Sequence, residues 1–144
     1  MASNSRFQLA SVDIRVAFLQ SKVLDRDVFV EPPSYVKKQG WIWRLKKPLY
    51  GLDDASRMFW LCVKEVFLCE LGLCTIHGDE AFYFSNVDGV LHGAILTHVD
   101  DFDIAGTPDF IKKVIDHVGR ELTVSKIEED CFRFTGLDIG RLHQ

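Results

Sequence analysis

Residues Ala94–Gly106 read Ala-Ile-Leu-Thr-His-Val-Asp-Asp-Phe-Asp-Ile-Ala-Gly, and two adjacent carboxylates, Asp100 and Asp101, stand between two apolar runs. The first run ends at Val99 and the second covers Phe102–Ala105, a pattern typical of two strands joined by a tight turn. The stretch therefore predicts a β-hairpin with an acidic tip. Because Asp side chains often hydrogen-bond the backbone of turns, a solvated turn would explain this stretch by itself.

A third carboxylate, Asp13, lies far upstream in another strand-like run, Leu9–Phe18, which reads Leu-Ala-Ser-Val-Asp-Ile-Arg-Val-Ala-Phe. Alternation places Ser11 and Asp13 on one face of this strand and Val12 and Ile14 on the other. Mg²⁺ prefers oxygen ligands, and two such ions about 3.5–4 Å apart serve phosphoryl transfer. Three acids at the ends of two neighbouring strands therefore predict a divalent-metal site.

Four segments of the chain resemble, in the same order, the motifs of copia-type retrotransposon reverse transcriptases. Val12–Leu19 resembles motif A, and His98–Asp101 resembles the Tyr-Val-Asp-Asp of motif C. Trp43–Leu52, followed by Ala55–Arg57, resembles the family's Leu-Tyr-Gly-Leu-Lys-Gln-Ala-Pro-Arg block, and Phe134–Ile139 resembles its closing Phe-Leu-Gly-Ile-Glu-Ile. The four segments occur in the family's order and span the chain from Phe7 to Arg141, which makes the resemblance specific.

The resemblance implies an α+β fold, a ferredoxin-like polymerase palm with an antiparallel sheet and two helices packed on one face. The expected order of strand, helix, hairpin, helix and strand agrees with it, because this is the order of a split βαβ unit. Residues 1–144 would form a single palm-like domain that lacks most of the fingers, the thumb and the RNase H region. We therefore expect weak or no polymerase activity from these residues alone.

The implied activity is RNA-directed DNA polymerisation, a two-metal nucleotidyl transfer of a dNTP onto a primer 3′-hydroxyl. Asp13, Asp100 and Asp101 would be the catalytic residues and the ligands of Mg²⁺ or Mn²⁺. The implied partners are an RNA or DNA template-primer, the dNTP and the rest of a Pol polyprotein, with no membrane. The expected location is intracellular, either cytoplasmic in a virus-like particle or nuclear.

Substrate contacts are implied for residues that follow the motif A acid and for the Tyr-Gly block. They are Ile14, Arg15, Val16, Ala17, Phe18, Tyr50, Gly51 and Arg57. In the family the aromatic residue at the position of Phe18 lies under the incoming sugar and excludes a ribose 2′-hydroxyl. From the apolar pattern alone, residues 17–19 are more simply interpreted as core.

The chain departs from the family pattern near both motifs. Asp53 and Asp54 stand where relatives carry Lys-Gln, Ser56 replaces Pro, His98 replaces Tyr, and Asp103 adds a fourth carboxylate. Acids beside a triphosphate cost Coulomb energy, although the same acids also favour the start of a helix as N-caps. A catalytically dead or repurposed fragment that acts as a binding or structural module therefore stays open as the alternative. A nucleotide cyclase is a third candidate, which the Tyr-Gly block disfavours.

Size and composition indicate one folded globular unit, with 144 residues of which 47% are hydrophobic. A net charge of −4 argues against strong autonomous binding of nucleic acid. Arg44, Lys46 and Lys47 alternate with aromatic residues in the run 41–47. This run is interpretable either as a phosphate-contacting edge or as a solvated edge strand protected by lysines.

The four cysteines have neither the spacing of a disulfide framework nor that of a zinc ribbon. They are Cys62, Cys69, Cys74 and Cys131, and we expect reduced, buried thiols. Cys74 and His77 form a lone Cys-x-x-His, which without a second ligand pair does not predict zinc. No signal peptide and no apolar run of about 20 residues is visible, so no membrane span is expected.

Local signals predict the remaining elements. They are strands at 28–30, 41–47, 81–84 and 90–99, a helix from about Asp54 to Leu71 ended by Gly72, a turn at Asp88-Gly89, a second helix that starts at Thr107-Pro108, and a strand pair within Asp130–Arg141. The long helix is apolar on nearly all sides, which indicates burial against a sheet and further protein.

Overall fold

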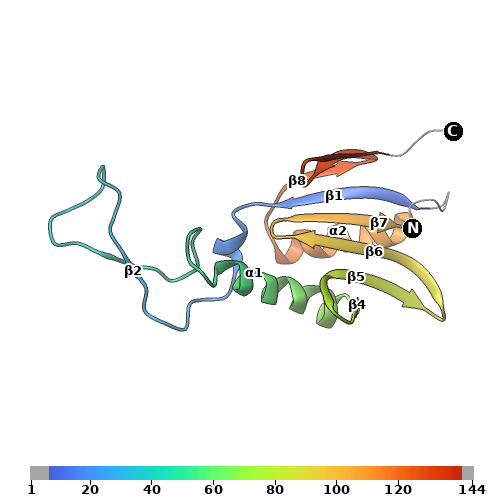
Figure 1. Ribbon diagram of the computed structural model, residues 1–144, viewed down its shortest axis with the longest axis horizontal. Coiled ribbons are helices and arrows are strands. Elements are labelled where there is room, and N and C mark those ends of the chain that lie inside the picture. The colour runs from blue at the N-terminus through green and yellow to red at the C-terminus, as the bar shows by residue number, and fades with distance from the viewer. Residues whose placement is uncertain (1–6, 141–144) are drawn as a thin grey trace.

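The computed structural model describes residues 7–140 and contains a six-stranded antiparallel sheet with the strand order β4-β5-β6-β7-β1-β8 (Figure 1). Its strands are β1 (Gln8–Ile14), β4 (Cys74–Ile76), β5 (Asp79–Val87), β6 (Val90–His98), β7 (Asp101–Gly106) and β8 (Val124–Glu129). Two small antiparallel sheets pair β2 (Phe29–Val30) with β3 (Trp43–Arg44), and β9 (Cys131–Phe134) with β10 (Leu137–Gly140). The helical elements are η1 (Ala17–Gln20, 3₁₀), α1 (Ala55–Lys64), η2 (Glu65–Glu70, a π-helical turn) and α2 (Pro108–Glu121). The predicted α+β class is confirmed.

One face of the central strands forms the core. Ala10, Val12 and Ile14 of β1 are at most 1% exposed, and they belong to one cluster with buried residues of both α1 and α2. The expected alternation along β1 is therefore confirmed, and it leaves Asp13 on the face opposite the helices. Because the pleat of β1 continues in its neighbour, Phe102 is also buried while Asp101 is only half-buried.

The first long helix follows the prediction with one change. α1 continues without a break into η2, a π-helical turn, and Gly72, at a φ of 67°, ends the run as predicted. Within α1 the buried side chains are Ala55, Phe59 and Val63, which confirms burial against the sheet, whereas contact of the opposite side with further protein stays a prediction. Cys62 is half-buried and the other three cysteines are exposed, which corrects the expected burial of the thiols; all four are free.

The start of α2 is fixed by local chemistry and by one close contact. The Thr107 hydroxyl accepts a hydrogen bond from the Phe110 backbone N–H at 3.3 Å, and Pro108 opens the helix as predicted. The Phe110 ring lies so close to Gly93 of β6 that a Cβ there would come within 2.2 Å of it. A side chain at residue 93 would therefore displace the helix start from the sheet.

A long excursion, residues 28–47, extends away from the sheet and is called the arm below; it carries β2 and β3 (Figure 1). Only Trp43–Arg44 of the predicted strand 41–47 pairs with β2, because the rest of this run finds no partner strand. The Leu45 N–H donates to the Val28 carbonyl at 2.8 Å and closes the base of the arm. Its aromatic side chains are exposed: Phe29, Tyr35, Trp41 and Trp43.

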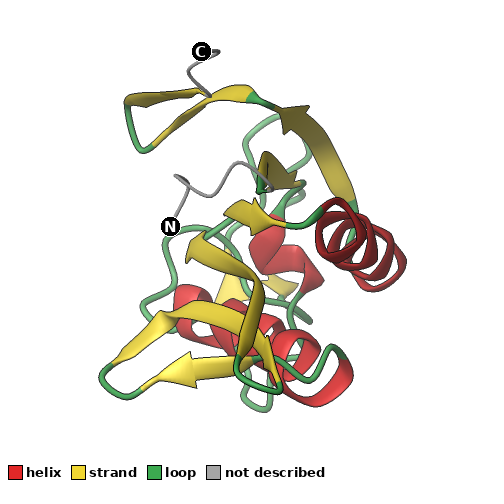
Figure 2. Cartoon of the chain, turned by 90° about the vertical axis from the view of Figure 1, so that its right-hand side faces the viewer, coloured by secondary structure: helices red, strands yellow, loops and turns green. Residues whose placement is uncertain are grey.

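The predicted C-terminal strand pair is present as the β9–β10 hairpin, which lies beside β8 at one edge of the sheet (Figures 1 and 2). Arg141, the predicted end of this pair, lies outside the described residues. The short strand β4 was not predicted, because Cys74–Ile76 has only 3 residues, too few for a periodic pattern to stand out. Within residues 7–140, no helix has the length and apolar content to cross a membrane.

Candidate catalytic site

The two acidic segments, far apart in sequence, meet at one end of the central strands. Asp13 lies directly opposite Asp101 in the pairing of β1 with β7. The backbone N–H of Ile14 donates to the carbonyl of Asp100 at 2.8 Å, which ties the end of β1 to the β6–β7 turn. The sheet thus brings the three acids that the sequence singled out to neighbouring positions, Asp13 on β1, Asp101 on β7 and Asp100 in the turn before β7.

The backbone beside these acids adopts a conformation that β-branched residues rarely accept. Val99, in the turn before Asp100, has a φ of 55°, and Val16, after β1, has a φ of 45°. Such conformations persist only where surrounding contacts determine them. Both turns that border the acids are therefore held by the rest of the fold.

Negative charge accumulates on this end of the sheet. Burial raises the pKa of Asp101, and the charges of Asp100 and Asp13 raise it further, while His98 lowers it. Burial also raises the pKa of Asp103 to about 6, and Oδ1 of this residue is buried without a hydrogen-bond partner. These carboxylate oxygens repel one another, and no basic side chain within residues 7–140 offsets their charge fully. Such a set of oxygen donors fits a hard divalent cation such as Mg²⁺.

The three carboxylates nevertheless do not converge on a single point. Among residues 7–140, the group whose ligand atoms all lie within 4.8 Å of one another is Glu70, His117 and Glu121, between η2 and α2. There His117 Nε2 contacts Glu70 at 2.8 Å, and Arg120 lies 3.4 Å from His117 Nδ1. Both ring nitrogens already have protein partners, so this second cluster is explained as a tie between the two helical elements.

The predicted substrate-binding residues separate into buried and exposed groups. Ile14, Ala17 and Phe18 are buried in the core, whereas Arg15 and Val16 are exposed between them. Ala17 and Phe18 therefore pack inward, as the core interpretation expected, but that interpretation was wrong for Leu19, which is 40% exposed. The exposed pair lies next to Asp13, where a side chain is free to contact a ligand.

Phe18 also contacts the Tyr-Gly block. Its ring centroid lies 4.3 Å from that of Tyr50, at an interplanar angle of 44°, so the structure brings motif A and the block after it together. Tyr50 is 60% exposed and Phe18 is 7% exposed. Gly51 has a φ of 97°, which glycine tolerates, and Arg57 is exposed in the first turn of α1.

Two of the departures from the family pattern have structural explanations. Asp54 occupies the N-cap position of α1 but makes no capping hydrogen bond, so the expected side-chain cap was wrong for this residue. Its carboxylate instead pairs with Arg26, whose Nη2 lies 2.8 Å from Oδ1, and this guanidinium lowers the pKa of Asp54. His98 contacts the edge of Phe134 in β9, with centroids 6.2 Å apart, which is a packing role.

Two polar side chains around Asp13 were missed by sequence reasoning. Ser125 of β8 donates a hydrogen bond to the Asp13 carboxylate, and Gln20 bonds the backbone of Arg15 and Thr123. The first contact joins residues 112 positions apart, and no motif marks either residue. Only the strand register reveals them.

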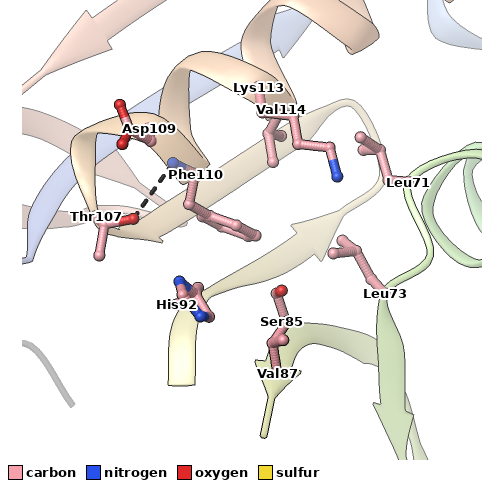
Figure 3. A pocket seen from close by; sticks show the side chains of 10 residues that line it. All are labelled: Leu71, Leu73, Ser85, Val87, His92, Thr107, Asp109, Phe110, Lys113 and Val114. Carbon is pink, nitrogen blue, oxygen red and sulfur yellow. Dashed lines mark hydrogen bonds between the residues drawn. The ribbon is translucent and has the colours of Figure 1, made fainter. Parts of the chain in front are cut away.

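A cleft of about 430 Å³ lies elsewhere, between the start of α2 and the β5–β6 hairpin (Figure 3). The ring of Phe110 points into the cleft from the start of α2, and Leu71 and Leu73 lie across the cleft from it. His92 and Lys113 lie at the border of the cleft. None of the three acids lines it, because they lie at the opposite ends of β6 and β7. The cleft is therefore separate from the acidic site.

Comparisons with known proteins agree with the motifs. A family model described as "Reverse transcriptase (RNA-dependent DNA polymerase)" matches residues 1–141. Among curated proteins, the chain is 26% identical to the "Retrovirus-related Pol polyprotein from transposon RE2" of Arabidopsis thaliana over 100% of this chain and 10% of that protein. It is 23% identical to the corresponding RE1 polyprotein over 99% of this chain and 10% of that protein.

A third relative extends the match to another plant. The "Retrovirus-related Pol polyprotein from transposon TNT 1-94" of Nicotiana tabacum is 26% identical over 74% of this chain and 8% of that protein. The chain thus spans 10% or less of the length of these three relatives. The family match covers nearly every residue, and the relatives are Pol polyproteins of plant transposons, which confirms the copia-type resemblance. The chain belongs to the reverse transcriptase (RNA-dependent DNA polymerase) family.

Proposed function

We propose that residues 1–144 form the palm of an RNA-directed DNA polymerase, with Asp13, Asp100 and Asp101 as its catalytic acids. The observation that carries this proposal is the pairing of Asp13 with Asp101, fixed by the hydrogen bond from Ile14 N–H to the Asp100 carbonyl. This pairing places acids from two distant motifs at one strand end. Family membership supports the reaction class.

The strand order supports the palm assignment. Within the large sheet, β6, β7, β1 and β8 are successive neighbours, with α1 before the β6–β7 hairpin and α2 after it. This order supports the proposed ferredoxin-like split βαβ unit, in which the first strand and the hairpin lie side by side. The face of that unit away from the helices carries Asp13 and Asp101, while the other face packs on the helices.

In the proposed reaction, the primer 3′-oxygen bonds to the α-phosphorus of the dNTP as the bond to the pyrophosphate oxygen breaks. Mg²⁺ or Mn²⁺, when bound by the three acids, would lower the pKa of the primer hydroxyl and neutralise charge on the leaving pyrophosphate. The hydroxyl proton leaves to solvent. Arg15, exposed beside Asp13, offers a positive charge to the triphosphate, and the exposed ring of Tyr50, supported from below by the buried Phe18, offers an aromatic surface to the sugar.

The arm supplies the complementary charge for a template strand. It carries Lys37, Lys38, Arg44, Lys46 and Lys47 against one acid, Glu31, although the whole chain has a net charge of −4. Exposed tryptophans alternate with these cations, which is the combination that binds single-stranded nucleic acid through phosphate contacts and base stacking. We therefore assign the phosphate-contacting edge to the arm.

Metal binding and primer extension test this proposal on the 144-residue chain. We expect Mn²⁺ to bind the wild type and to bind Asp100→Asn at least 10-fold more weakly, because a ligand oxygen loses its charge. Asp116→Asn, which changes an exposed acid on α2, is the matched control and should bind as the wild type does. Any primer extension with Mn²⁺ should disappear in Asp100→Asn.

Two outcomes would contradict the assignment. Primer extension that survives Asp100→Asn would exclude these acids as the metal ligands. A wild type that binds Mn²⁺ no better than Asp100→Asn would instead support the alternative, a fragment acting as a binding or structural module. Because the three carboxylates do not converge on a single point in the structure, Mn²⁺ binding by the wild type is the decisive measurement.

A further inference from the structure

The pairing of β1 with β8 contains an irregularity at Asp13. Asp13 is paired with Lys126, but the next residue, Ile14, is paired with Val124, so Ser125 is an extra residue without a partner. An extra residue of this kind is a β-bulge, which bends the strand locally and re-aims a side chain. Here the bulge lies directly beside the candidate metal ligand.

Ser125 uses this position to hold Asp13. Its hydroxyl donates to the Asp13 carboxylate oxygen Oδ1 and lies 3.2 Å from the Asp13 carbonyl. Lys126, the residue paired with Asp13, instead contacts Glu128 at 2.8 Å. A hydroxyl fixes the orientation of a carboxylate without cancelling its charge, whereas a lysine ammonium would compete with a metal ion for the same oxygens. The bulge thus leaves Asp13 oriented and still negatively charged.

Gln20 holds the backbone that follows Asp13. Its amide oxygen accepts from the Thr123 N–H at 2.6 Å, and its amide nitrogen donates to the carbonyls of Thr123, at 3.1 Å, and of Arg15. The Arg15 N–H in turn donates to the Thr123 carbonyl at 3.0 Å. These bonds bracket Val16, whose φ of 45° requires support from its surroundings.

We propose that Ser125 and Gln20 are positioning residues for the reaction, and that the corner between α2 and β8, residues 123–125, is the platform on which they hold motif A. Ser125 orients the Asp13 carboxylate, and Gln20 fixes the strained turn after it. This inference rests on the proposed function, because Asp13 needs orientation only if it binds a cation. Both residues act through Asp13 and the turn after it, and neither touches substrate.

The test of Ser125 is Mn²⁺ titration calorimetry on the full chain. Ser125→Ala should weaken Mn²⁺ binding about 10-fold, as the loss of a group that orients a metal ligand does, and Ser125→Thr, which keeps the hydroxyl, should restore it. Ser56→Ala is the control, because Ser56 is an exposed serine on α1, far from Asp13 in sequence. The thermal midpoint should be unchanged in all three variants, since Ser125 is exposed.

The test of Gln20 does not involve the metal. Gln20→Ala should accelerate amide hydrogen exchange at Arg15 and Thr123 about 10-fold or more while core amides such as that of Val12 keep their rates. Unchanged exchange at both amides would overturn the role of Gln20. Because this readout needs no activity and no ion, it reports on the platform directly.

The Mn²⁺ outcomes separate this inference from the proposed function. If Asp13→Asn abolishes Mn²⁺ binding and Ser125→Ala binds as the wild type does, Ser125 is not a positioning residue and the proposed function stands. If the wild type binds Mn²⁺ no better than Asp13→Asn, the proposed function fails, and the role of Ser125 fails with it. Weakened binding in Ser125→Ala that Ser125→Thr does not restore would indicate a structural role alone and would also overturn the inference.

Discussion

The sheet with its two helices, called the body, and the arm use the same kinds of residues in opposite ways. In the body, Phe67 and Phe102 are fully buried and contact each other, with ring centroids 5.4 Å apart. In the arm, Phe29 is 55% exposed and Trp41 is 58% exposed. Hydrophobic content therefore stabilises the body, but in the arm it remains available to a partner.

Charge separates the two regions further. The arm has a net charge of +4 from five basic residues and one acid. Because the whole chain has a net charge of −4, the residues outside the arm have a net charge of −8. The acidic end of the body, which carries Asp13 and Asp101, suits cations, and a basic, aromatic arm suits a phosphate backbone. Averaged over the whole chain, these two preferences cancel, which is why overall composition argued against nucleic-acid binding.

The largest expected difference between the regions is in core stability. Phe102→Ala should lower the free energy of unfolding by about 3–5 kcal/mol, because it removes a fully buried ring from the middle of the sheet. Phe29→Ala, the same change in the arm, should cost less than about 1 kcal/mol, because its ring is already half in water. Urea denaturation of both variants measures the two values. Equal losses would mean that the arm packs on the body in solution and would remove the distinction.

The elements of the body were predictable from local sequence, because hydrophobic period and turn chemistry depend there on residues close together in the chain. The alternation of Val12 and Asp13, the Asp88-Gly89 turn and the Thr107 cap each depend on neighbours within a few residues, and each was predicted. The arm was less predictable, because Trp41–Lys47 has the alternation of a strand but meets only the two residues of β2. A strand needs a partner, and local sequence does not supply one.

The candidate site shows the same limit. That Asp13 and Asp100 come together was predicted, because the motifs and the split βαβ order indicated that the two strand ends lie side by side. The bulge at Ser125 and the clamp of Gln20 were not, because both depend on the register of β1 against β8, more than 100 residues away. The expected side-chain cap at Asp54 was wrong for the same reason, because its carboxylate pairs with the distant Arg26 instead.

A smaller effect should appear in the body only at alkaline pH. Burial raises the pKa of Tyr83 to about 12, helped by the charge of Glu80, and its hydroxyl is buried without a hydrogen-bond partner. Above pH 10 the unfolded tyrosine ionises while the folded one does not, so the folded state binds more protons and stability falls as the pH rises toward 12. Tyr83→Phe should therefore be near neutral at pH 7 and should remove a loss of about 2 kcal/mol at pH 11–12.

The matched control for this pH dependence is Tyr35→Phe in the arm. Tyr35 is 86% exposed, so folding does not bury its hydroxyl, and its removal should leave the alkaline stability curve unchanged. Thermal or urea unfolding between pH 8 and 12 gives both curves. If Tyr83→Phe loses stability in parallel with the wild type, the Tyr83 hydroxyl is not shielded from water.

The smallest effect on stability, and the sharpest test of the arm, comes from its charges. Lys46→Ala with Lys47→Ala should change the free energy of unfolding by less than about 0.5 kcal/mol, because both side chains are exposed. The same double variant should weaken binding to single-stranded RNA and lower the slope of log K against log salt by about 1.4, the value for two lost phosphate contacts. Lys112→Ala with Lys113→Ala removes the same charge from exposed positions on α2 and should leave that slope unchanged, as fluorescence anisotropy at several salt concentrations would show. Equal changes in both double variants would mean that the RNA responds to net charge alone, and the difference between arm and body would then carry no consequence for nucleic-acid binding.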